Sequence, residues 1–367
     1  MNIQMSLSNA KDLFLAPCNS ASSSKSNIDI LNYVHVSILD HKIKVVGTDS
    51  QALIIKNGHI ECNDDFAVCI EANKLAAVLN GFDDTSKDIK FDFNFENKVQ
   101  IKYGRSKMTI ATADASVFPI PRLEQPTQYA FICDSKELVN AFSEIQYARA
   151  KRDVRQFLNH ISYSIANGVI SMFASDGHRL VKTNVTVLDC SLETQGILPV
   201  GLLELIHSVN PSGQCKFYFD NSNFFCEIEG LVLASKFVAE KFTDVSKLLT
   251  PPILNTMTMK TTDLMKAVNR VRQFLGSVKL AKLTLTLNNN DLMLNADAGT
   301  GNEIDDFIEV ATTHGNEGQL SLNPTYLLDA IKNIKSDLVS LSFTSSNMLK
   351  ISDPSNAEFD AVIMAMR

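Results

Sequence analysis

A pentapeptide near the middle of the chain holds the residue types used for nucleophilic catalysis. Ser175, Asp176 and His178 lie within four residues of one another, and Arg179 follows them. In a hydrolase the imidazole contacts both the hydroxyl and the carboxylate, and such triads are assembled from separate segments of a fold. Asp176 followed by Gly177 is instead typical of a tight turn, because glycine adopts a positive φ without strain. We therefore interpret the segment as a turn with an exposed histidine and arginine that suit binding, and keep a hydrolase using Ser175, Asp176 and His178 as the weakest alternative.

The cysteines and histidines form no pattern typical of a metal or redox site. The chain has seven of each, with no CxxC pair and no HExxH segment. We interpret the cysteines as reduced and mostly buried, since free cysteine behaves as a small hydrophobic residue. The sequence thus predicts no metal, no cofactor and, the hydrolase alternative aside, no catalytic site.

The composition is that of an acidic, folded protein. Of 367 residues, 45% are hydrophobic and 20% are charged, and 34 basic residues against 41 acidic ones give a net charge of −7. This excludes a uniformly basic nucleic-acid coat but allows a local basic surface. No apolar run approaches the roughly 20 residues of a membrane span, and the N-terminus lacks the basic start and apolar core of a signal peptide. We expect a cytoplasmic protein of two or three domains.

A threefold repeat organises the chain. Segments that begin at Asn2, Tyr129 and Thr256 each run from an alternating strand through a Ser, Thr or Asp cap into an amphipathic helix, and their starts are 127 residues apart. In the third helix the spacing predicts one apolar face of Leu264, Val268 and Val271. A second strand–helix pair follows in each repeat, over residues 67–79, 196–206 and 318–334. The intervening strands alternate with period two, which is typical of antiparallel sheets. The pattern predicts an α+β fold of three similar domains, each with two helices on antiparallel sheets, over residues 1–125, 126–251 and 252–367.

Basic residues gather at related places in the three repeats. They are Lys11 and Lys25 in the first, Arg149, Lys151, Arg152 and Arg155 in the second, and Lys266, Arg270 and Arg272 in the third. A solvated helix face explains any one of these groups. Their recurrence favours a positive surface that contacts phosphates without reading sequence. No aromatic platform for stacked bases accompanies them, which disfavours single-strand recognition.

Four segments share the motifs of one known protein family. Residues 158–181, LNHISYSIANGVISMFASDGHRLV, are similar to a family stretch LNG…ATDGHRLA, and residues 234–249, ASKFVAEKFTDVSKLL, are similar to a stretch containing KFPDY. SLNPTYLLDAIKNI and the closing VIMAMR are similar to the family's last helix and tail. Together these segments resemble the bacterial DNA polymerase sliding clamp, the beta subunit of DNA polymerase III. The resemblance covers the whole chain and implies a head-to-tail homodimeric ring of six domains that encircles duplex DNA as a processivity factor.

The resemblance also implies partners and their sites. A clamp loader opens such a ring, and the DNA polymerase III catalytic subunit and other replication or repair proteins dock through a clamp-binding motif in a hydrophobic cleft. Carried over by motif, the cleft residues are Leu158, Ser175, Gly177, His178, Arg179, Leu180, Thr243, Lys247, Leu248, Asn323, Tyr326, Ser346, Met348, Val362, Met364, Ala365, Met366 and Arg367. The implied duplex contacts are Lys25, Arg152, Arg155, Gln156 and Phe157. The implied dimer contact places Met108 and Ile110 against Phe274 and Leu275 of the second copy.

The chain departs from the family pattern inside this cleft. Thr243 and Val245 replace the proline and tyrosine of FPDY, Ala365 replaces the proline of the tail, and His160 replaces the glycine of LNG. These replacements predict a divergent member with a cleft of altered shape and its own partner motif. A clamp-like scaffold that does not encircle DNA is a second alternative.

Overall fold

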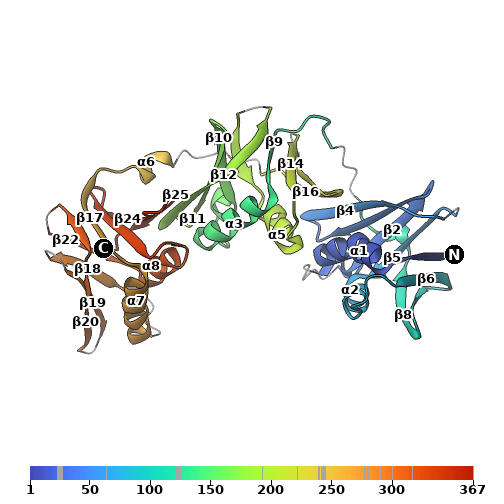
Figure 1. Ribbon diagram of the computed structural model, residues 1–367, viewed down its shortest axis with the longest axis horizontal. Coiled ribbons are helices and arrows are strands. Elements are labelled where there is room, and N and C mark those ends of the chain that lie inside the picture. The colour runs from blue at the N-terminus through green and yellow to red at the C-terminus, as the bar shows by residue number, and fades with distance from the viewer. Residues whose placement is uncertain are drawn as a thin grey trace. The chain divides into compact units, whose positions relative to one another are not determined.

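The computed structural model describes residues 1–22, 28–62, 64–120, 125–191, 193–220, 222–238, 240, 245–276, 278, 281–288, 291–299, 301–315 and 317–366. Its internal contacts divide the chain into two compact units. Unit 1 comprises residues 1–139, 186–192 and 198–238, and unit 2 comprises residues 140–185, 193–197 and 239–367. Figure 1 labels their helices and strands.

Unit 1 forms because apolar residues recur at helical spacing beside alternating strands. In α1 (Leu7–Ser22) the buried residues Leu7, Leu13, Phe14 and Cys18 share one face and pack on strands of the same unit. Gly47 of β3 lies against this helix, where an added Cβ would come within 1.9 Å of the carbonyl oxygen of Pro17. The helix and the sheet therefore approach one another more closely than any side chain at Gly47 would permit.

The strands of unit 1 form two antiparallel series. One series pairs in the order β1–β6–β7–β8 and the other in the order β5–β2–β3–β4–β16–β15–β14–β9. The bounds are β1 Asn2–Ser6, β2 Tyr33–Leu39, β3 Lys42–Thr48, β4 Ala52–His59, β5 Phe66–Glu71, β6 Asp88–Phe95, β7 Lys98–Tyr103, β8 Ser106–Ala113, β9 Phe131–Asp134, β14 Gln214–Phe219, β15 Asn223–Ile228 and β16 Leu231–Lys236. The other helices are α2 Ala72–Asn80, α5 Val200–Val209, η1 Asp29–Asn32 and η2 Ala115–Val117.

Unit 2 is built in the same manner. One antiparallel series runs β12–β25–β24–β23–β17–β21, another runs β20–β19–β18–β22, and β10 pairs with β11. The bounds are β10 Ile161–Ala166, β11 Val169–Ser175, β17 Ile253–Lys260, β18 Leu283–Asn288, β19 Asp291–Gly299, β20 Asn302–Glu309, β21 Thr312–His314, β22 Gly318–Leu322, β23 Leu338–Thr344, β24 Met348–Asp353 and β25 Asn356–Met364. Its helices are η3 Gln146–Ala148, α4 Gln156–Asn159, α6 Ser246–Leu249, α7 Thr261–Leu275 and α8 Pro324–Ile331. Three elements contribute to both units: α3 Ser135–Ile145, β12 Arg179–Cys190 and β13 Gln195–Leu198.

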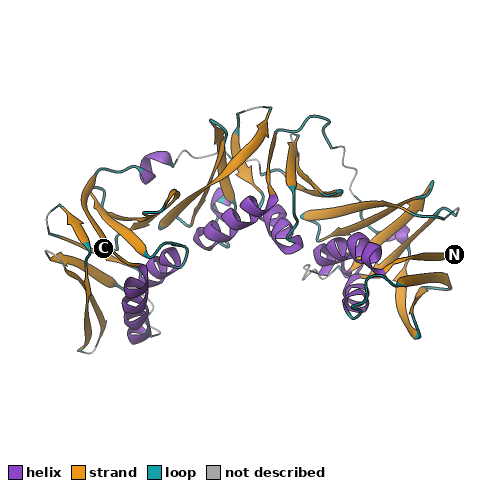
Figure 2. Ribbon diagram, viewed as in Figure 1, coloured by secondary structure: helices purple, strands orange, loops and turns teal. Residues whose placement is uncertain are grey.

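The predicted strand–helix repeat is confirmed in the elements β1–α1, β9–α3 and β17–α7. In α7 the predicted apolar face of Leu264, Val268 and Val271 is fully buried. The predicted caps differ among the repeats. Asp134 accepts hydrogen bonds from the amides of residues 136 and 137 at the start of α3, whereas α7 has no side-chain cap at Lys260. Figure 2 shows the helices of each unit beside its strands. None of the helices in the described ranges is long and apolar enough to cross a membrane.

Candidate partner cleft and interfaces

The segment that begins at Ser175 is a tight turn between β11 and β12. The Ser175 hydroxyl donates a 2.7 Å hydrogen bond to the carbonyl of Arg179 and accepts one from the amide of Gly177 at 3.1 Å. Asp176 Oδ1 accepts from the amides of His178 and Arg179 at 3.0 and 3.1 Å. Gly177 has a φ of +88°, the conformation that glycine adopts without strain. The hydroxyl and carboxylate thus hold the turn, and among the described residues neither of them bonds to the imidazole as a catalytic triad requires.

Arg179 was predicted to be exposed, and this prediction is wrong. Its side chain is only 11% exposed, and its Nε donates to Asp176 at 3.0 Å. Its Nη1 donates to Asp329 of α8 at 2.8 Å, and its Nη2 to the backbone carbonyl of Tyr147 at 2.6 Å. The guanidinium also lies over the rings of Tyr147 and Tyr326, 5.1 and 4.4 Å from their centroids. These are favourable cation–π distances, and they turn the charge inward, away from any ligand.

This cluster around Arg179 includes two residues that the sequence did not point to. Tyr147, in η3, has a buried hydroxyl without a hydrogen-bond partner in the described structure, and burial raises its pKa. Asp329 lies on α8, 150 residues further along the chain, and its carboxylate accepts a hydrogen bond from Arg179. The ring of His178, which is exposed as predicted, lies 6.5 Å from the ring of Tyr326 at an interplanar angle of 22°. Two residues of the turn, His178 and Arg179, therefore lie against residues of α8.

An apolar cluster lies beside this turn. Leu180, Met348 and Val362, all predicted cleft residues, are buried together with Phe173 and Leu249. The pairing of β12 with β25 brings Leu180 and Val362 together, because they stand opposite one another in the antiparallel register. Phe173 and Leu249 were missed by the sequence analysis. Strand alternation places Phe173 on the face of Ser171 and Ser175, opposite the buried Ile170 and Met172, so the pattern alone gave no sign that it would be buried.

The C-terminal tail is held against this cluster by its backbone. The amide of Met364 donates to the carbonyl of His178 at 2.9 Å, and that of Ala365 donates to Asn347 at 3.1 Å. The amide of Met366 donates to the carbonyl of Ser321 at 2.7 Å. The side chain of Met364 stays 52% exposed. The tail therefore presents an accessible apolar side chain next to a buried apolar floor.

The other predicted cleft residues fall into three groups. Lys247, Leu248 and Ser346 are exposed, Leu158 is buried, and Asn323 caps α8 by accepting a 2.9 Å bond from the amide of Thr325. Val245, one of the departures from the family pattern, packs against the apolar cluster. Thr243 and Arg367 lie outside the described residues.

Among the predicted duplex contacts, the charges are not equally free. Arg152 is exposed, and no ion pair to it is found among the described residues. Arg155 is also exposed but pairs with Asp153 at 2.9 Å. The neighbouring amides of Gln156 and Phe157 donate to the carboxylate of Glu240 at 3.1 and 2.8 Å. Arg152 is therefore the strongest phosphate-binding candidate of this segment, and Lys25 lies outside the described residues.

The four predicted dimer residues divide by exposure. Ile110 and Leu275 are each 2% exposed and belong to the cores of their own units. Phe274, at the end of α7, is 39% exposed, and Met108 of β8 is partly buried. Met108 and Phe274 are thus the two of these four side chains that reach the surface.

Comparison with known proteins identifies the family of this chain. Residues 5–123 match the model of the N-terminal domain of the DNA polymerase III beta subunit, and residues 253–367 match the model of its C-terminal domain. The chain is 24% identical over 352 residues to the beta sliding clamp of Haemophilus influenzae, covering 94% of each chain. It is 22% identical over 351 residues to that of Streptococcus pneumoniae, covering 92% of each.

Solved structures share the fold. The DNA polymerase sliding clamp from Bacillus subtilis matches with a TM-score of 0.88 at 15% identity, covering 100% of this chain and 99% of that one. The DNA polymerase III subunit beta from Pseudomonas aeruginosa matches with a TM-score of 0.87 at 21% identity, covering 100% of both chains. The family-model matches at both ends of the sequence show that this chain belongs to the DNA polymerase III beta-subunit family and is a sliding clamp, a processivity factor and not an enzyme.

Proposed function

We propose that two copies of this chain join head to tail in a ring that encircles duplex DNA and tethers a replicative polymerase. Each copy contributes three domains, over residues 1–125, 126–251 and 252–367, and the ring acts on cytoplasmic DNA. A clamp loader opens it, and polymerase and repair proteins dock at the cleft beside Leu180 and Met364. The observation that carries the proposal is a pair of free, oppositely charged strand edges.

The first free edge belongs to β8 in unit 1. β8 pairs with β7 along residues 106–111, and among the described residues its other side meets a strand, β5, only at residues 112 and 113. Basic side chains surround this edge: Arg105 and Lys107 are exposed, as are Lys98 and Lys102 on β7. An unpaired edge is a template for another strand, and charge restricts which strand can join it.

The second free edge belongs to β20 in unit 2. β20 is the outer strand of its four-stranded sheet and carries the sequence NEIDDFIE, with four acidic residues. Phe307 on this strand is 61% exposed, and α7, which ends with Phe274 and Leu275, packs against β20. Two different edges of opposite charge support a heterologous contact, and such contacts generate rings when the rotation closes. Phe274 and Met108 provide apolar side chains for the same contact.

Duplex binding would rest on phosphate contacts. Arg152 is an exposed cation of the second repeat, Lys25 is its candidate counterpart in the first, and α7 carries Lys266 and Arg270. Arg270 pairs with Asp306 at 2.6 Å, which leaves Arg152 and Lys266 as the freer of these candidate phosphate contacts in the described residues. Contacts of this kind are independent of sequence and sensitive to salt, as a clamp that slides requires.

The experiment that tests the proposal is retention on DNA of two topologies. The purified protein is loaded by its clamp loader onto nicked circular plasmid, and half of the sample is then linearised by a restriction enzyme. We expect the clamp to remain on circles through gel filtration and to leave linear DNA. Equal retention on both forms would contradict encirclement and favour a scaffold that does not enclose DNA.

A further inference from the structure

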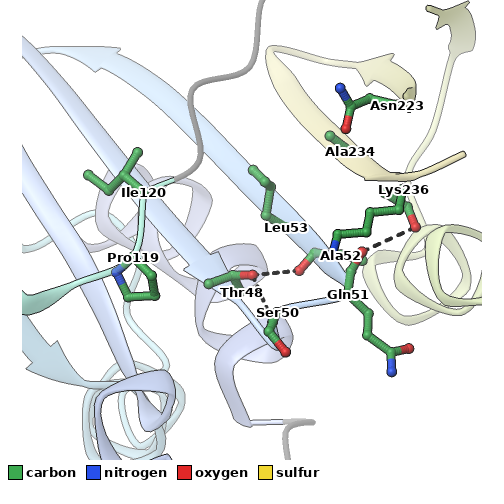
Figure 3. Close-up of a pocket in the computed structure, with 11 residues that line it drawn as sticks. Thr48, Ser50, Gln51, Ala52, Leu53, Pro119, Ile120, Asn223, Ala234 and Lys236 are labelled. Atoms are coloured by element: carbon green, nitrogen blue, oxygen red, sulfur yellow. Dashed lines mark hydrogen bonds between the residues drawn. The ribbon is translucent and has the colours of Figure 1, made fainter. Parts of the chain in front are cut away.

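A cavity of about 350 Å³ lies in unit 1, away from the cleft described above. Figure 3 shows it between the end of β3, the start of β4 and the strands β15 and β16. Its apolar lining consists of Ala52, Leu53, Pro119, Ile120 and Ala234. The volume falls at the small end of the roughly 300–1,000 Å³ that ligand pockets occupy, which leaves room for the apolar side chains of a short peptide segment.

The turn at this cavity repeats the turn at Ser175 bond for bond. The Thr48 hydroxyl donates to the carbonyl of Ala52 at 2.8 Å and accepts from the amide of Ser50 at 3.1 Å, as the Ser175 hydroxyl does with its own neighbours. Asp49 Oδ1 accepts from the amides of residues 51 and 52 at 2.9 and 2.8 Å. Ser50 has a φ of +73°, in the place where Gly177 has +88°.

The strands beyond the two turns also correspond. In unit 1, Ala52 and Leu53 of β4 stand opposite Ser235 and Ala234 of β16. In unit 2, the corresponding residues of β12, Arg179 and Leu180, stand opposite Ile363 and Val362 of β25. Leu53 and Ala234 belong to one buried cluster with Phe118, as Leu180 and Val362 belong to the other. The cavity thus occupies, one repeat earlier, the position of the partner cleft.

Two differences indicate what the cavity would accept. Ala52 stands where the second turn has Arg179, so no guanidinium fills the space beside the turn. Lys236, the last residue of β16, lines the cavity and is exposed, without an ion pair among the described residues. None of the residues recorded as lining the cavity is acidic. A cavity with an apolar floor and a free cation at its rim fits an apolar side chain that has a carboxylate close to it.

We propose that this cavity is a second peptide-docking site, which takes a leucine or phenylalanine flanked by an acidic residue from a partner protein. The proposal rests on the proposed function, because it assumes that partners of this clamp carry short apolar motifs. Partners with two such motifs would bind one chain at two places. The gain in affinity would then depend on whether the linker between the motifs spans both sites.

Photo-crosslinking tests this site and the cleft separately. The probe is an amidated peptide, acetyl-Gln-Leu-Asp-Leu-benzoylphenylalanine, applied to the full-length protein, with crosslinked residues mapped by mass spectrometry. We expect crosslinks at the cavity, on residues 48–53, 119–120 or 234–236, as well as at the cleft. Lys236→Glu should lower cavity crosslinking about fivefold, the range of an exposed ion pair, and Ile120→Asp should abolish it. Both residues are exposed, so neither variant disturbs the core.

Met364→Asp is the matched control, since it alters the cleft alone. It should remove crosslinks at the cleft and leave those at the cavity. Crosslinks confined to the cleft in the wild-type protein would overturn the second site while leaving the proposed function intact. Crosslinks confined to the cavity would support the second site and refute the cleft assignment, and crosslinks at neither would refute both. Cavity labelling that survives Lys236→Glu and Ile120→Asp unchanged would be non-specific and would also overturn the proposal.

Discussion

Replacing Arg179 by methionine removes the contact that fixes the Ser175 turn to the rest of unit 2. Methionine keeps the length and the apolar stem of arginine but has no donor. Asp176 and Asp329 would lose their guanidinium partner, and the backbone carbonyl of Tyr147 would lose its hydrogen bond at 2.6 Å. The stacking over the rings of Tyr147 and Tyr326 would lose its charge.

The size of the effect follows from how buried these groups are. Removing one partner of a buried ion pair destabilises a protein by about 3–5 kcal/mol, because a desolvated charge is left behind. The side chain of Arg179 is 11% exposed, and those of Asp176 and Asp329 are 16% and 28% exposed. The carboxylates are therefore partly hydrated once the arginine is gone, which places the expected loss at the low end, about 3 kcal/mol.

Hydrogen–deuterium exchange measures this loss locally. A loss of about 3 kcal/mol predicts exchange on the order of 100-fold faster in peptides covering η3 and α8. Peptides from β8 in unit 1 serve as an internal reference, since they belong to the other unit. Arg155→Met is the matched control variant. Arg155 also pairs with an aspartate, but its side chain is 54% exposed, and we expect no measurable change in exchange.

One result would refute this reasoning. If exchange in η3 and α8 of the Arg179→Met variant matched that of the Arg155→Met variant, the buried contacts of Arg179 would contribute nothing net. The helix α8 would then be held to the turn by apolar packing alone.

Three further predictions concern other parts of the chain. Burial by itself raises the pKa of Asp353, but hydrogen bonds from Ser336, Ser355 and the amide of Lys335 outweigh it and bring the pKa to about 2. Because the folded pKa lies below the usual 3.8, this carboxylate stabilises the fold above about pH 4. About 2 kcal/mol of the free energy of unfolding is lost as the pH falls through 2. Urea unfolding measured over a range of acid pH should show that loss in the wild type and not in Asp353→Asn. Phe274→Asp should sediment as a folded monomer, because an unpaired charge would be buried at the proposed interface, and a persistent dimer would move the interface elsewhere. Arg152→Ala should lower the slope of log affinity against log salt by about 0.9 for duplex DNA, and an unchanged slope would exclude a phosphate contact there.

The features fixed by local pattern were predictable from the sequence. The spacing of Leu264, Val268 and Val271 predicted the buried face of α7, and Asp176 followed by Gly177 predicted the tight turn. The direction of Arg179 was not predictable, since its main partner lies 150 residues away on α8. A charged residue in a turn is usually solvated, and only the fold reveals that carboxylate and aromatic partners surround this one.

The two turns show how a repeat can keep one geometry and change its chemistry. In both, a hydroxyl and an aspartate satisfy the same four backbone and side-chain bonds. The third residue of the turn therefore tolerates a change from Gly177 to Ser50, although a positive φ is less favourable for serine. The fifth residue of the turn differs in what it contacts. Arg179 bonds to Asp329 of α8, whereas the small side chain of Ala52 lines a cavity. The arginine-to-alanine difference between the repeats thus accompanies a turn that is bonded to α8 in one repeat and a turn that lines an apolar cavity in the other.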